Sequence, residues 1–187
     1  NEGTGQPHPA RIGEHIVTNN TIMLNGASAI QGAGASGVVS FNAVEENGFL
    51  RLLPPKQCRP NSTAELATIK THGFTGTMVG NVLRRNVGSG RAVWFDNRWR
   101  DVRFSRNVLL GSGGLMFELS NGPALVDNNI LFGSNMTGEG PEQDSSLPYA
   151  RDAAIFVQDA SSITSAYNLV LGFSTVVLSL GGLTGRN

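Results

Sequence analysis

Length, composition and charge already exclude several kinds of protein. The chain has 187 residues, of which 40% are hydrophobic and 15% charged, and its formal net charge is zero. This suits one domain with a substantial core. Without an excess of basic residues there is no stripe for a nucleic-acid backbone and no patch for anionic lipid, so we expect no nucleic acid and no membrane as partner.

Cys58 is the only cysteine, which excludes an internal disulfide framework and a thiolate zinc cluster. No apolar run approaches the ~20 residues of a membrane span. Because the chain starts at Asn1 and not at Met, we expect either a processed secreted protein or a fragment of a longer one.

Short apolar runs predict β-strands along the whole chain. Each is rich in Val, Ile, Leu or Phe, is bounded by Gly, Asn or Ser, and lacks an apolar stripe at helical period. In chain order they occupy 16–24, 36–44, 76–83, 91–96, 101–110, 114–119, 123–132 and 163–172.

The middle of the chain repeats at an offset of 22 residues. This offset places Trp94 on Met116 and Asp96 on Glu118. A period in the range of about 20 to 50 residues is typical of a solenoid, in which each repeat buries its apolar face against its neighbours. Extending the repeat outward gives about six coils.

One asparagine recurs in every coil. In a stack of parallel coils, identical amides lie one strand spacing apart and can hydrogen-bond along the stack, and Asn also tolerates left-handed backbone geometry at turns. We therefore predict an internal ladder of Asn20, Asn42, Asn81, Asn107, Asn129 and Asn168.

Two of the steps along this ladder are longer than the others. Asn42 to Asn81 and Asn129 to Asn168 each span 39 residues, which is one 22-residue coil plus 17. These steps predict inserted loops at about 50–72 and 134–151. Loops of this length usually bind, cover or gate something, and these two are expected to rise on the same side of the solenoid.

The units “GNVLRRN”, “FSRNVLLGSGG” and “VDNNILFGS” resemble the coils of right-handed parallel β-helix proteins, a group that includes many polysaccharide hydrolases and lyases. The resemblance implies an all-β, right-handed parallel β-helix with ~22-residue coils over residues 1–187. It also implies a secreted or extracellular protein, with the periplasm as the alternative, whose partner is a polysaccharide or oligosaccharide. Members of the group also serve as adhesins, tailspikes and structural stalks, so a non-catalytic module is a second expectation.

Strand alternation predicts which side chains of the central repeat face outward. If Phe95 and Phe117 point into the core, then Trp94, Asp96 and Glu118 point to the outside, which avoids charges in an apolar lumen. Asp96 and Glu118 would then lie about 5 Å apart on neighbouring coils.

Two carboxyl groups at that separation form a candidate catalytic pair. Because neighbouring like charges oppose ionisation, one pKa is expected to rise, leaving one acid and one base. The spacing also matches the ~5 to 5.5 Å of retaining glycosidases. We therefore assign Glu118 as acid/base and Asp96 as nucleophile or stabiliser of glycosidic cleavage in a groove on the outside of the β-helix.

Four neighbouring residues are the expected substrate contacts. Trp94 offers a flat surface for a sugar ring, and Arg98, Trp99 and Arg100 in the next turn are expected to bind an acidic sugar. His72, with Lys70 nearby, is a weaker candidate base, and Asp127 is expected to cap a turn.

Two alternatives to hydrolysis stay open. In a polysaccharide lyase, Asp96 and Glu118 would hold calcium against a uronate while an Arg or Lys removes a proton. No other cofactor or metal is expected. The non-catalytic alternative is favoured by the final “STVVLSLGGLTGRN”, which lacks a polar cap and so predicts missing flanking coils or a homo-oligomer docked through its ends.

Overall fold

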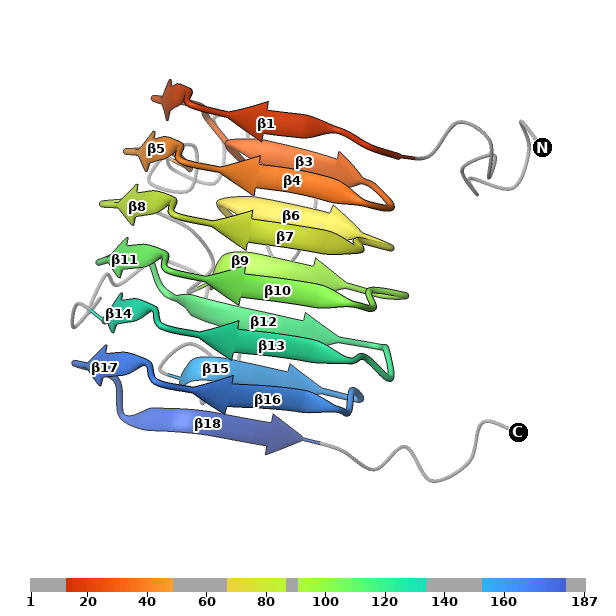
Figure 1. Ribbon diagram of the computed structural model, residues 1–187. Coiled ribbons are helices and arrows are strands. Elements are labelled where there is room, and N and C mark those ends of the chain that lie inside the picture. Colours follow the sequence, from red (N-terminus) through yellow and green to blue (C-terminus); the bar gives the residue numbers. More distant parts are fainter. Residues whose placement is uncertain (1–12, 49–66, 87–90, 134–152, 181–187) are drawn as a thin grey trace, which may run out of the picture.

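The chain winds repeatedly through three parallel β-sheets (Figure 1). The computed structural model describes residues 13–48, 67–86, 91–133 and 153–180. These residues form 18 strands and no helix, and each sheet has six strands. Every third strand along the chain belongs to the same sheet, so the prediction of an all-β solenoid is confirmed, in an arrangement consistent with a parallel β-helix.

Sheet A consists of β1 (Ile16–Thr18), β4 (Gly37–Ser40), β7 (Gly76–Val79), β10 (Val102–Ser105), β13 (Ala124–Asp127) and β16 (Ile163–Ala166). Sheet B consists of β2 (Thr21–Met23), β5 (Ala43–Glu45), β8 (Val82–Arg84), β11 (Val108–Leu110), β14 (Ile130–Phe132) and β17 (Leu169–Leu171). Sheet C consists of β3 (Ile30–Ala33), β6 (Ile69–His72), β9 (Arg91–Asp96), β12 (Gly114–Glu118), β15 (Ala153–Gln158) and β18 (Thr175–Leu180). Among these residues no helix could span a membrane.

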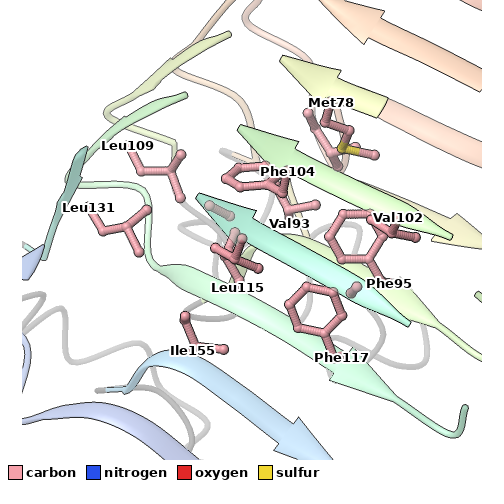
Figure 2. Close-up of a cluster of buried hydrophobic side chains, with 14 of the residues drawn as sticks. Met78, Val93, Phe95, Val102, Phe104, Leu109, Leu115, Phe117, Leu131 and Ile155 are labelled. Atoms are coloured by element: carbon pink, nitrogen blue, oxygen red, sulfur yellow. The ribbon is translucent and has the colours of Figure 1, made fainter. Parts of the chain in front are cut away.

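The lumen between the sheets is filled by side chains that stack from coil to coil. Phe95 of β9 and Phe117 of β12 are in register, and their rings stack with centroids 4.8 Å apart (Figure 2). Phe104 of sheet A meets Phe95 edge-on at 6.4 Å. Each fully buried ring of this kind contributes on the order of 1.5–3 kcal/mol to folding, so these stacks hold the three sheets together.

The predicted asparagine ladder is confirmed at the bend between sheets A and B. Asn107 is completely buried. Its Nδ2 and backbone N–H both donate to Oδ1 of Asn129, at 3.2 and 2.8 Å, and its own Oδ1 accepts the same pair of bonds from Asn81. The left-handed residue at each bend is, however, the one before the ladder asparagine, such as Phe41 and Arg106. The ladder amides therefore stabilise the bend by hydrogen bonding and not by adopting the unusual backbone geometry.

A second ladder, which the repeat did not lead us to predict, lies at the bend between sheets B and C. Asn25 Nδ2 donates to Asn47 Oδ1 at 2.8 Å, and Asn47 Nδ2 donates to Asn86 Oδ1 at 2.9 Å. The next coil substitutes a hydroxyl, because Asn86 Nδ2 donates to Ser112 Oγ at 3.1 Å. In the described coils, side-chain amides and the hydroxyl of Ser112 thus stabilise two of the three bends.

The expected insertions fall mostly outside the described residues. Of the loop expected at 50–72, the final residues Ile69–His72 form strand β6. The loop expected at 134–151 lies wholly outside the described residues. One connects β5 to β6 and the other connects β14 to β15, so both leave sheet B and both lead into sheet C.

Candidate functional site

The outer face of sheet C carries the predicted catalytic pair. The prediction that Phe95 and Phe117 point inward is confirmed, since both belong to the lumen core. Trp94 pairs in register with Met116, and these two side chains belong to a separate apolar cluster on the outer side of the sheet. Strand alternation therefore places Asp96 and Glu118 on this same outer side.

The outer-face cluster is buried although it lies outside the lumen. It consists of Ala67, Trp94, Met116, Ala153 and Phe156, each at most 5% exposed. Lys70 stands in register with Trp94 and is only 2% exposed. This part of sheet C is therefore not a solvated surface, in contrast to the open sheet face that alternation alone would suggest.

The indole of Trp94 is already in contact with two cations. Lys70 Nζ lies 3.6 Å from the ring centroid, and Arg91 Cζ lies 4.4 Å from it. Both distances fall within the range of cation–π attraction. The stacking of a sugar on Trp94 stays a prediction, and it would require one of these cations to move.

Asp96 lies between two basic side chains from strand β6. Lys70 Nζ is 3.1 Å from Asp96 Oδ2, and His72 Nδ1 is 3.3 Å from the same oxygen. The three side chains differ in accessibility: Lys70 is 2% exposed, Asp96 10% and His72 43%. His72 is therefore the member of this trio that solvent reaches most easily, and its Nδ1 is the nitrogen turned toward Asp96.

Glu118 has a different environment from Asp96. Trp94 Nε1 donates a hydrogen bond to Glu118 Oε2 at 3.0 Å. Burial raises the pKa of Glu118 above its ordinary value, and the neighbouring charge of Asp96 raises it further. Arg91, the bond from Trp94 and Lys70 oppose this shift without reversing it. The expected rise of one pKa is present, but its largest cause is burial and the like charge comes second.

The structure corrects the assignment of Trp99 to sugar binding. Its side chain is completely buried in the lumen core, and its ring meets Phe117 edge-on with centroids 5.1 Å apart. Trp99 Nε1 donates to the backbone carbonyl of Glu118 at 3.0 Å, so this residue holds the end of β12 in place. Arg98 and Arg100 are exposed in the same bend, and their predicted contact with an acidic sugar stays a prediction.

Asp127 belongs to another part of the solenoid, on sheet A. Arg103 Nη2 and Nε donate to its two carboxylate oxygens at 2.9 and 3.1 Å, and Ser105 Oγ donates at 3.1 Å. The hydrogen bonds from Arg103 are the main cause that lowers the pKa of Asp127 below its ordinary value. Asp127 therefore forms an ion pair across coils, where we had expected a turn cap.

The contacts of Lys70 and His72 with Asp96 were not predicted, because the bends between sheets C and A differ in length. Three residues, 73–75, separate β6 from β7, whereas five residues, 97–101, separate β9 from β10. Asp96 lies 11 residues before the ladder asparagine Asn107. The same count back from Asn81 reaches Lys70, so the sequence repeat aligns Lys70 with Asp96. In the structure His72 aligns with Asp96, and Lys70 aligns with Trp94.

The arrangement does not fit a calcium ion well. Calcium takes 6–8 oxygen ligands, whereas this face brings together two carboxyl groups, one of which already contacts Lys70 and His72. Within the described ranges no group of three or more His, Cys, Asp and Glu side chains is placed to hold a metal.

The chemistry available here is proton transfer between carboxyl and imidazole groups. Glu118 can carry a proton at higher pH than an ordinary glutamate, and Asp96 can stabilise positive charge beside it. No family model, curated protein or solved structure matches this chain, so the functional argument depends on the fold and on this site.

Proposed function

We propose that this protein cleaves glycosidic bonds of a polysaccharide on the outer face of sheet C. Glu118 acts as the acid/base, and Asp96 acts as nucleophile or as stabiliser of positive charge on the sugar. The observation that carries the proposal is the unequal environment of two carboxyl groups on adjacent coils. Burial raises the pKa of Glu118, whereas Asp96 contacts Lys70 and His72.

The different environments of Glu118 and Asp96 suit the two different roles that carboxyl groups have in glycoside hydrolysis. The leaving oxygen must receive a proton as the bond breaks, which requires a carboxyl group that still holds its proton near the working pH. The oxocarbenium-like transition state requires a negative charge close by. The raised pKa of Glu118 favours the protonated form that the first requirement calls for, and the carboxyl group of Asp96 is the neighbouring group that we assign to the second.

The proposal extends to the finer features of the fold and setting. We take the solenoid to be right-handed, as parallel crossover connections almost always are, with coils of about 22 residues. An extracellular location and a polymeric carbohydrate partner agree with the resemblance to polysaccharide-active β-helix proteins. The outer cluster of sheet C is buried, so we take the polymer to approach at the end of the strands where His72 is 43% exposed.

An activity screen tests this function. Wild type would be incubated with neutral and uronate polysaccharides, with and without calcium, while reducing ends and the ultraviolet absorbance of unsaturated uronates are measured. We expect reducing ends without absorbance, and loss of at least about a hundredfold in rate in Glu118→Gln. Asp127→Asn is the matched control, because it removes another ion-paired, buried carboxylate away from the site. Calcium-dependent absorbance would contradict hydrolysis and assign a lyase.

A non-catalytic carbohydrate-binding or structural module is the second candidate. The observation in its favour is the burial of Trp94 beneath Lys70 and Arg91, since a contact of this kind can serve stability alone. Failure of the folded wild type to cleave any polymer of the panel would favour this module over the enzyme.

A further inference from the structure

His72 and Asp96 form a contact in which one ring nitrogen of the histidine faces the carboxylate. Nδ1 of His72 lies 3.3 Å from Asp96 Oδ2. A carboxylate on one ring nitrogen holds the imidazole in one orientation and leaves Nε2 for another partner, as in catalytic dyads and triads. His72 is also 43% exposed, whereas the carboxylate beneath it is 10% exposed.

We propose that His72 is the general base that activates water, and that the protein is an inverting glycosidase. This inference rests on the function proposed above, and it assigns Asp96 the role of stabiliser and not of nucleophile. A nucleophilic carboxylate must reach the anomeric carbon directly. Oδ2 of Asp96 already contacts Lys70 Nζ at 3.1 Å as well as the imidazole, and these contacts favour the role of stabiliser.

The strand spacing distinguishes the two mechanisms. His72 lies on β6 and Glu118 on β12, and β9 runs between them. Two spacings of ~4.8 Å place these residues about 9.6 Å apart along the sheet. Inverting enzymes separate their acid and base by ~6.5 to 9.5 Å so that a water fits between base and sugar, whereas retaining enzymes need ~5 to 5.5 Å. The spacing between the strands of His72 and Glu118 therefore lies at the upper limit of the wider separation, and the spacing between the strands of Asp96 and Glu118 is close to the shorter one.

The reaction then balances as one displacement. The oxygen of water forms a bond to the anomeric carbon while the bond from that carbon to the leaving oxygen breaks. Glu118 gives its proton to the leaving oxygen, and Nε2 of His72 accepts a proton from the attacking water. The carboxylate of Asp96 stabilises the resulting imidazolium. Exchange of these protons with solvent restores both residues, and the new reducing end has the inverted configuration.

The anomer formed first tests this assignment. The panel would contain polygalacturonate, alginate, xylan and β-1,3-glucan, and the polymer that wild type cleaves would be digested under proton NMR. We expect the inverted anomer to appear first. We also expect His72→Asn to lower kcat at least about a hundredfold. His15→Asn, which changes another exposed histidine, should retain wild-type activity, and added imidazole should restore part of the activity of His72→Gly.

A covalent intermediate tests the role of Asp96 separately. Wild type quenched in acid during turnover should show no glycosyl adduct in its intact mass. A retained anomer, an adduct on Asp96, or a His72→Asn variant as active as His15→Asn would overturn this inference, while a loss of cleavage in Glu118→Gln would leave the proposed function standing. Absence of cleavage by wild type on all four polymers would overturn both.

Discussion

Lys70 Nζ lies 3.1 Å from Asp96 Oδ2, and the two side chains are only 2% and 10% exposed although they stand on the outside of the solenoid. A buried charge is tolerated when a partner of opposite sign compensates it, and removal of one partner leaves the other unpaired. The carboxylate of Asp96, which we place in the reaction, therefore also contributes to the stability of the fold through its ion pair with Lys70.

Lys70→Met is expected to destabilise the fold by about 3 kcal/mol, because it leaves Asp96 buried without its lysine. Urea unfolding at neutral pH would measure this loss. The double variant Lys70→Met/Asp96→Asn should recover part of it, since no unpaired charge remains. A single variant as stable as wild type would show that His72 alone compensates Asp96.

Asn107→Ala is expected to lower the free energy of unfolding by roughly 3 kcal/mol or more, because several buried donors and acceptors lose their partners at about 1–3 kcal/mol each. The affected bonds join Asn107 to Asn81, Asn129 and the carbonyl of Met78. Asn121→Ala is the matched control. Its exposed amide oxygen accepts one bond from Ser161, so the effect there should stay within about 0.5 kcal/mol. Equal losses in the two variants would contradict a structural role for the ladder.

Glu118→Gln is expected to make the protein more stable than wild type at neutral pH. Because its pKa is raised in the folded chain, Glu118 favours folding below its ordinary value of 4.5, and wild type loses this contribution as pH rises through the raised pKa. Glutamine stays neutral and can still accept the bond from Trp94. Thermal unfolding across pH should show a gain at neutral pH that fades as pH falls toward 4.5. A loss of stability at neutral pH would contradict this account.

Asp127→Asn should behave in the opposite way. Because the pKa of Asp127 is lowered in the folded chain, its contribution is present above the ordinary value of 3.8 and disappears as pH falls through the lowered pKa. The variant should therefore be less stable than wild type at neutral pH, and the difference should shrink as pH falls below 3.8. A difference independent of pH would indicate that packing, and not charge, is responsible.

The features predicted correctly all depend on strict repetition. The ladder from Asn20 to Asn168 and the inward positions of Phe95 and Phe117 follow from one residue type recurring at one position in successive coils. Such positions can be predicted from the sequence because parallel strands place equivalent residues in register and because alternate side chains share a face. The second ladder, from Asn25 to Ser112, repeats with the same steps of 22, 39 and 26 residues and could have been found by the same comparison.

The features missed lie where the repetition fails. Trp99 sits in a bend, where alternation gives no indication of direction, and it turns into the lumen. The alignment of His72 with Asp96 depends on the length of the bend between sheets C and A, which differs between coils. The alternation of apolar residues in the strands does not indicate this length. Burial of the outer-face cluster could not be predicted either. The alternation of side chains along a strand shows which residues share a face, but it does not show whether the outer face is covered.

The bend between sheets B and C has a consequence for engineering. Asn47 and Asn86 make their ladder bonds before the chain continues to β6 and β9 over connections of different length. The hydrogen bonds that fix the bend between sheets B and C are thus made before the connection of variable length begins. Foreign sequences could be grafted after Ser112, just before β12 begins at Gly114, so that a new loop is displayed at the end of β12 opposite Glu118 on an unchanged scaffold.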